Sequence, residues 1–121
     1  MATDLEDFRR GDTFLLRFNW GTGVDITGWT LTFSLRDSFT SELITSVKRT
    51  AGDYPLDEVL NGVFYYFYDS ESSKALIPKK YKYDLQLVIP GTFKQVKTLL
   101  PKKENYNEPL IILPDVTWID V

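Results

Sequence analysis

Residues 29–36 read Trp-Thr-Leu-Thr-Phe-Ser-Leu-Arg, and this stretch decides the fold. Large apolar side chains alternate with small or polar ones, which predicts a β-strand with one buried face and one face in water. The same period recurs in residues 13–20, where the buried face would carry Phe14, Leu16, Phe18 and Trp20. The two stretches predict neighbouring strands of an all-β domain.

Further strands follow from the same pattern and from the turn residues between them. They are expected at residues 43–49, 63–68, 81–89, 92–100 and 110–113. One short helix is expected near 70–77, because Asp69 or Ser70 can cap its first turn and Pro78 ends it. About seven to eight strands in 121 residues indicate a single antiparallel β-sandwich domain, residues 1–121.

One detail favours an immunoglobulin-like β-sandwich. A strand, a short helical crossing and then a strand opening with Tyr81 imitate the E–F corner of that fold, where a tyrosine hydroxyl ties down the turn. Trp29, at the start of its strand, would be the core aromatic residue. The cysteine pair of many such domains is missing, so the likeness is one of pattern.

The turn at Pro90-Gly91 allows a register to be predicted for its hairpin. If Ile89 lies opposite Thr92, then Asp84 lies opposite Lys97, and their two side chains point to the same face of the hairpin. Such a pair of opposite charges is favourable by a few tenths of a kcal/mol up to about 1 kcal/mol. The pair would support the register rather than a function.

The composition excludes several kinds of chemistry. The chain has no histidine and no cysteine, which rules out imidazole-based triads, thiol redox couples and thiolate or imidazole zinc sites. The acidic residues at 4–7 and 53–58 do not reproduce the spacing of a calcium loop. We expect no catalytic residues, no metal and no cofactor, with a two-carboxylate hydrolase as the remaining enzymatic alternative.

A tripeptide near the N-terminus has a plain structural interpretation. Arg10-Gly11-Asp12 spells the integrin-binding tripeptide, but it leads directly into a strand, so we expect Gly11 to supply a backbone turn.

The longest aliphatic run, residues 110–113, is far shorter than the roughly 20 residues that span a bilayer. The acidic N-terminus lacks the apolar region of a secretory signal. We expect a protein made in the cytoplasm, with no membrane partner.

Residues 63–68, Val-Phe-Tyr-Tyr-Phe-Tyr, are apolar on both faces. A sandwich strand with one face in water should alternate, so a second covering is required. Either the loop at residues 50–61 or a partner subunit can provide it, and tyrosine-rich patches are typical of interface cores. We take Tyr65 and Phe67, together with Leu15, as the candidate interface.

The net charge of −3 is unevenly distributed. Residues 74–103 contain eight lysines and one acidic residue. A basic zone of this kind can bind nucleic acid or an acidic surface, and this is the alternative function. Its candidate residues are Lys79, Lys80, Lys82, Lys94 and Lys97.

Several segments of the chain together resemble a known group of domains. They are Arg10-Gly11-Asp12-Thr13-Phe14, Val24-Asp25-Ile26-Thr27-Gly28-Trp29-Thr30, the strand at residues 31–36, Tyr83-Asp84-Leu85-Gln86-Leu87 and Asp115-Val116-Thr117. The chain resembles the small immunoglobulin-like domains of tailed bacteriophages, such as the N-terminal domain of baseplate upper proteins and related tail or neck proteins.

The resemblance implies a non-enzymatic structural protein of a phage or prophage virion, located in the baseplate, tail or neck. Its partners would be copies of itself or other phage structural proteins. In baseplate upper proteins a long receptor-binding chain follows this domain, whereas here the chain stops just after Asp115-Val116-Thr117. A small stand-alone virion or prophage protein is therefore favoured, with no catalytic residues to transfer.

Overall fold

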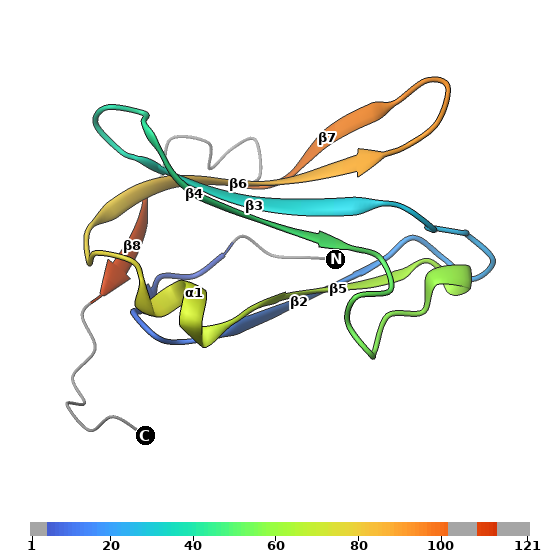
Figure 1. Ribbon diagram of the computed structural model, residues 1–121, viewed down its shortest axis with the longest axis horizontal. Coiled ribbons are helices and arrows are strands. Elements are labelled where there is room, and N and C mark those ends of the chain that lie inside the picture. Colours follow the sequence, from blue (N-terminus) through green and yellow to red (C-terminus); the bar gives the residue numbers. More distant parts are fainter. Residues whose placement is uncertain (1–4, 102–108, 114–121) are drawn as a thin grey trace.

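A computed structural model describes residues 5–101 and 109–113 of the chain, and this part is mostly β-strand (Figure 1). Eight strands are present in the described part, with one helical turn and one 3-10 turn. In chain order, the strands and the two helical turns are β1 (Phe8–Arg9), β2 (Phe14–Asn19), β3 (Thr30–Asp37), β4 (Leu43–Thr50), η1 (Val59–Asn61), β5 (Val63–Tyr68), α1 (Ser70–Lys74), β6 (Lys80–Ile89), β7 (Gln95–Leu100) and β8 (Leu110–Leu113). The all-β prediction is confirmed.

The strands form two sheets of unequal width. The large sheet has the order β1-β8-β6-β3-β4, and β7 also pairs with β6. The small sheet contains β2 and β5, which pair antiparallel. One pairing departs from the expected antiparallel arrangement, because β1 runs parallel to β8. The sequence did not predict β1, since two residues are too few to show a period.

The core lies between the two sheets. Leu31, Phe33 and Leu35 of β3 are buried, as the alternation predicts. Phe64, Tyr66 and Tyr68 of β5 are completely buried opposite them, and the Phe33 and Tyr68 rings meet edge to face at 5.1 Å. Fully burying one such apolar side chain contributes about 1.5–3 kcal/mol. The two inner faces therefore hold the layers together.

Polar contacts fasten β5 to β4 at one side of the sandwich. The buried Tyr66 hydroxyl donates a hydrogen bond to the Val47 carbonyl oxygen over 2.6 Å. Arg49, also on β4, donates from Nε to the Phe67 carbonyl oxygen over 3.2 Å. The small sheet thus sits toward the β4 side of the large one.

The helical crossing between β5 and β6 forms the expected corner. The Asp69 side chain caps α1 by accepting a hydrogen bond from the Ser72 amide. The helix was expected over residues 70–77, but it ends earlier, at Lys74. Tyr81 is buried, and its hydroxyl donates to the Ile77 carbonyl oxygen over 2.5 Å. The tyrosine tie predicted from the sequence is confirmed.

The Arg10–Asp12 turn packs against α1. Gly11 has a φ of +91°, which a residue with a Cβ adopts only with strain, so the predicted role for this glycine is confirmed. Its amide donates to the Ser73 hydroxyl and its carbonyl accepts from Ser70. The tripeptide therefore serves the fold locally, holding the start of β2 against the corner.

The predicted register of the β6–β7 hairpin is wrong. Ile89 lies opposite Gln95, so the loop spans residues 90–94 instead of two residues. Lys97 lies opposite Leu87, and the expected Asp84–Lys97 pair is not formed. The observed register puts the buried Leu100 opposite the buried Leu85. Burial of that pair decides the register, because a shift of a strand changes which side chains reach the core.

Trp29 is also placed differently from the prediction. It precedes β3 and is half-buried at the rim, where its ring meets Trp20 edge to face at 5.2 Å. Phe33 is the aromatic residue of β3 that lies in the core. The strand begins one residue later than expected, which leaves Trp29 beside the turn at Gly28.

Candidate interaction face

The outward side of the small sheet, called the outer face below, carries all three candidate interface residues. In the β2–β5 register, Leu15 lies opposite Phe67 and Arg17 lies opposite Tyr65. Paired residues of antiparallel strands point to the same side of the sheet. The Leu15 side chain is 44% exposed, while Tyr65 and Phe67 are half-buried. The structure therefore brings the predicted interface residues together on one surface.

Part of the outer face is covered by the loop that precedes β5. The Tyr54 ring stacks on Phe67, with centroids 5.8 Å apart and planes at 23°, and lies 5.9 Å from the Tyr65 ring. The sequence left open whether the loop or a subunit covers these aromatic residues. The loop covers them in part, but it leaves Leu15 uncovered.

One carboxylate holds this loop in place. Asp57 Oδ1 accepts a hydrogen bond from the Tyr65 amide over 2.6 Å. Its other oxygen, Oδ2, accepts from the Gly52 amide over 2.8 Å and from the Tyr54 amide over 3.3 Å. The position of the Tyr54 ring on the outer face therefore depends on Asp57.

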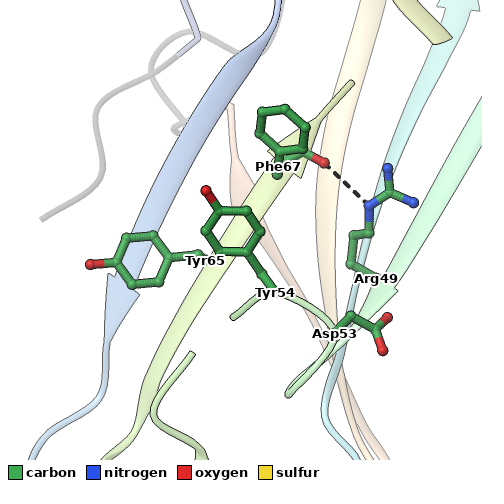
Figure 2. Close-up of a pocket in the computed structure, with 5 residues that line it drawn as sticks. All are labelled: Arg49, Asp53, Tyr54, Tyr65 and Phe67. Carbon is green, nitrogen blue, oxygen red and sulfur yellow. Dashed lines mark hydrogen bonds between the residues drawn. The ribbon is translucent and has the colours of Figure 1, made fainter. Parts of the chain in front are cut away.

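Beside Tyr54 the surface is hollowed (Figure 2). The hollow has a volume of about 260 Å³ and is lined by Arg49, Asp53, Tyr54, Tyr65 and Phe67. Ligand pockets are usually about 300–1,000 Å³ and bury most of their ligand. A hollow of this size and lining suits a side chain of a protein partner better than a cofactor.

The charges around the outer face have both signs, since Arg17 and Arg49 lie near Asp53 and Asp69. The Arg17 guanidinium lies over the Tyr65 ring, 6.0 Å from its centroid. Arg49 Nη2 pairs with Asp69 Oδ1 over 3.3 Å. The hydrogen bond from the Ser72 side chain, together with Arg49, lowers the pKa of Asp69. The free cation on this face is Arg17, within the part of the chain that the structure describes.

The five lysines of the alternative function are not gathered on one surface. Lys82 points outward with Lys80, whereas Lys97, opposite the inward Leu87, points to the other side of the sheet. Lys79 Nζ pairs with Asp37 Oδ2 over 2.6 Å, and this contact lowers the pKa of Asp37 and raises that of Lys79. Lys94 lies in the loop at the far end of β6. The set is divided between two faces and both ends of the strand.

Three of the acidic residues weighed as metal ligands, Asp7, Asp53 and Asp57, accept backbone hydrogen bonds instead. Asp53 accepts from the Thr50 amide and Asp7 accepts from the Ile111 amide, while Asp4 lies outside the described residues. Among the residues described, no cluster of acidic side chains could hold a metal ion. No helix in the same residues is long and apolar enough to cross a membrane.

No protein-family model matches this chain. No curated protein and no solved structure matches it either. What the protein does is therefore inferred from the geometry of the outer face and from the residues that build it.

The sequence missed three residues of this site, namely Tyr54, Asp57 and Arg49. A signal for Tyr54 was present, because a single aromatic residue stands in a polar loop that runs into a strand with two apolar faces. Arg49 and Asp57 gave no such signal. Each acts on a backbone group of β5, and only the tertiary structure reveals that contact.

Proposed function

We propose that this protein is a non-enzymatic structural protein of a tailed bacteriophage or prophage virion. It acts in the baseplate, tail or neck through protein–protein contacts with copies of itself or with other structural proteins. The observation that carries the proposal is the outer face, where an exposed Leu15 continues the aromatic row formed by Tyr54, Phe67 and Tyr65.

We also propose that the two sheets are an immunoglobulin-like sandwich. Two features support this assignment. The Tyr81 hydroxyl ties the corner between β5 and β6, as a tyrosine does in that fold. The pairing of β4, β3, β6 and β7 in one sheet, facing β2 and β5 in the other, fits the sheet arrangement of such domains.

The composition of the outer face supports an assembly role. Interface cores are enriched in tyrosine, phenylalanine and arginine, and the rest of their area is no more apolar than an ordinary surface. The outer face contains these residue types together with a hollow that can accept a side chain. Arg17 at its border can add electrostatic complementarity to an acidic partner.

The assembly role is tested by light scattering coupled to size-exclusion chromatography. We expect oligomers or a complex with a neighbouring virion protein, and we expect Leu15→Ser combined with Phe67→Ser to abolish them. The matched control is Thr32→Ala on the outward side of the large sheet, which should change nothing. A strict monomer at high concentration that also binds no protein encoded beside it would overturn the assembly role.

The virion assignment has a separate test in the genome. Genes for tail or head-completion proteins on both sides of the gene are expected. A location among metabolic genes, with no phage genes nearby, would overturn the assignment.

A further inference from the structure

The small sheet has two edges, and the edge of β5 is closed. Val63 and Glu58 exchange two backbone hydrogen bonds, of 3.1 and 2.9 Å. Further along the same edge, the Tyr65 amide donates to Asp57 and the Phe67 carbonyl accepts from Arg49. Val63, Tyr65 and Phe67, whose backbone groups face this edge, each have at least one of those groups hydrogen-bonded already. The edge is therefore blocked against an added strand.

The edge of β2 is open. Along a strand, successive residues direct their amide and carbonyl groups to opposite edges. The Trp20 amide donates to the Gly62 carbonyl oxygen, so in this register Phe18, Leu16 and Phe14 direct their backbone groups toward β5. Leu15 and Arg17 therefore direct theirs away from β5. No residue in the described ranges hydrogen-bonds the backbone of Leu15 or Arg17 along this edge.

The space beside this edge lies under the large sheet. Because β5 sits next to β4, the open edge of β2 points toward the β6–β7 side. Figure 1 shows β7 diverging from the small sheet, and residues 95–98 are exposed even though Lys97 lies opposite the buried Leu87. Leu5 and Phe8 also pack against the core: the Leu5 amide donates to the Tyr83 hydroxyl, and the Phe8 ring lies 5.7 Å from Phe14. No backbone hydrogen bond joins Leu5 or Phe8 to Leu15 or Arg17.

We propose that the β2 edge accepts one extended segment of another protein as a third strand of the small sheet. Main-chain hydrogen bonds to Leu15 and Arg17 would supply affinity, as in other cases where a peptide is added to a sheet edge. On the outer face the segment would carry an apolar residue beside Leu15 and an acidic residue beside Arg17. On the inner face its alternate side chains would be apolar.

A second copy pairing β2 with β2 fits this edge less well than a single segment does. Antiparallel pairing about a twofold axis would put both large sheets on the same side of the joined small sheet. The two β6–β7 hairpins would then face each other across the axis, whereas a single added segment meets only one of them. The inference uses an edge, whereas the proposed function uses the outer face, so each stands without the other.

The test uses a synthetic eight-residue peptide of valines with one central glutamate and a threonine at each end, at up to millimolar concentration. Calorimetric titration should detect binding. Hydrogen exchange should show that the Leu15 and Arg17 amides exchange rapidly in the free protein and become protected with the peptide bound. The same peptide N-methylated at alternate amides should not bind, because methylation removes its donors.

The protein variants separate the backbone contact from the charge. Arg17→Pro and Arg17→Ala both lose the guanidinium, but only the proline loses the outward amide. We expect Arg17→Pro to bind the peptide about tenfold more weakly than Arg17→Ala. Circular dichroism and thermal unfolding verify that both variants fold, and the N-methylated peptide tests the unmodified protein in case the proline variant does not.

Several results would overturn the inference. They are an absence of binding at millimolar peptide, equal binding of the N-methylated peptide, and Leu15 and Arg17 amides already protected in the monomer. Protection that appears only in a dimer of this chain would assign the edge to a second copy, which overturns the inference while supporting the self-assembly in the proposed function.

Discussion

The two edges of the small sheet are built from strands of equal length, yet they end differently. The β5 edge is closed by a loop backbone at Glu58, by the Asp57 carboxylate and by the Arg49 guanidinium. The β2 edge has no such partner in the described part of the chain at Leu15 or Arg17. Exposed edges invite pairing with other chains, and proteins commonly block them. This fold therefore blocks the β5 edge with backbone and side-chain groups from other segments, and it leaves the β2 edge available for pairing.

Removing the Asp57 carboxylate, which closes part of the β5 edge, should have the largest effect on stability. Asp57→Ala leaves three backbone amides without their acceptor, those of Gly52, Tyr54 and Tyr65. We expect the free energy of unfolding to fall by about 2–3 kcal/mol, since three hydrogen bonds to a charged group are lost and two of them are partly buried. Urea titration measures this change. Asp53→Ala is the control and should cost less than about 1 kcal/mol, because it removes one acceptor from an exposed turn.

A loss for Asp57→Ala no larger than that for Asp53→Ala would contradict the role assigned to the closed edge. Fluorescence of the tyrosines provides a second readout. Release of Tyr54 from the outer face should change its environment even where the stability changes little.

Proline substitutions compare the two edges directly. Tyr65→Pro removes an amide that Asp57 binds, and we expect it to cost about 2 kcal/mol more than Tyr65→Ala. Arg17→Pro removes an amide that has no partner on its edge, so it should differ from Arg17→Ala by less than about 1 kcal/mol. Chemical unfolding of the four variants gives both differences. Equal differences at the two edges would show that they do not differ as described.

Two buried tyrosines of β5, Tyr66 and Tyr68, test how much one hydrogen bond to β4 contributes to stability. Tyr66→Phe should lower the unfolding free energy by about 1 kcal/mol, because the hydroxyl donates to Val47 on β4. Tyr68 is the matched control. Among the described residues its buried hydroxyl has no hydrogen-bond partner, and burial raises its pKa to about 12. Tyr68→Phe should therefore leave stability unchanged or raise it, as measured by thermal unfolding.

The smallest effect concerns the ion pair next to the closed edge. Asp69 has a pKa lowered by the Ser72 hydrogen bond and by Arg49. A carboxylate with a lowered folded pKa contributes stability above its ordinary value of 3.8, and this contribution is lost as the pH falls through the folded value. Asp69→Asn should cost less than about 1 kcal/mol at pH 7 and nothing in stronger acid. A cost that persists in strong acid would contradict the electrostatic cause.

Much of the fold follows from local pattern. The alternation in residues 29–36 and 13–20 predicted the inward faces of β3 and β2, and the strand at residues 63–68 has the bounds of β5. The corner at Tyr81 was also predictable, because a strand, a capped turn and a tyrosine stand in order. These features depend on neighbouring residues, which the sequence displays directly.

The errors arose where distant residues decide the outcome. The β6–β7 register depends on burying Leu100 beside Leu85, and the turn signal at Pro90-Gly91 does not contain that information. Trp29 has the right period for a core residue, but its strand begins one residue later. Leu15, Tyr65 and Phe67 share one side of the small sheet, and their role as an interface stays a prediction. Tyr54 and Asp57, which shape that side, were missed.

The sequence by itself determined that this is an all-β chain, which side of each main strand is buried, and that residues 63–68 need a covering on both faces. Side-chain alternation and residue type suffice for these conclusions, since they are properties of single strands. Only the tertiary structure decided that Tyr54 supplies part of the covering and that one edge of the small sheet is closed while the other is open. Those outcomes depend on which backbone groups find partners from other segments, and the partners come together only when the chain folds.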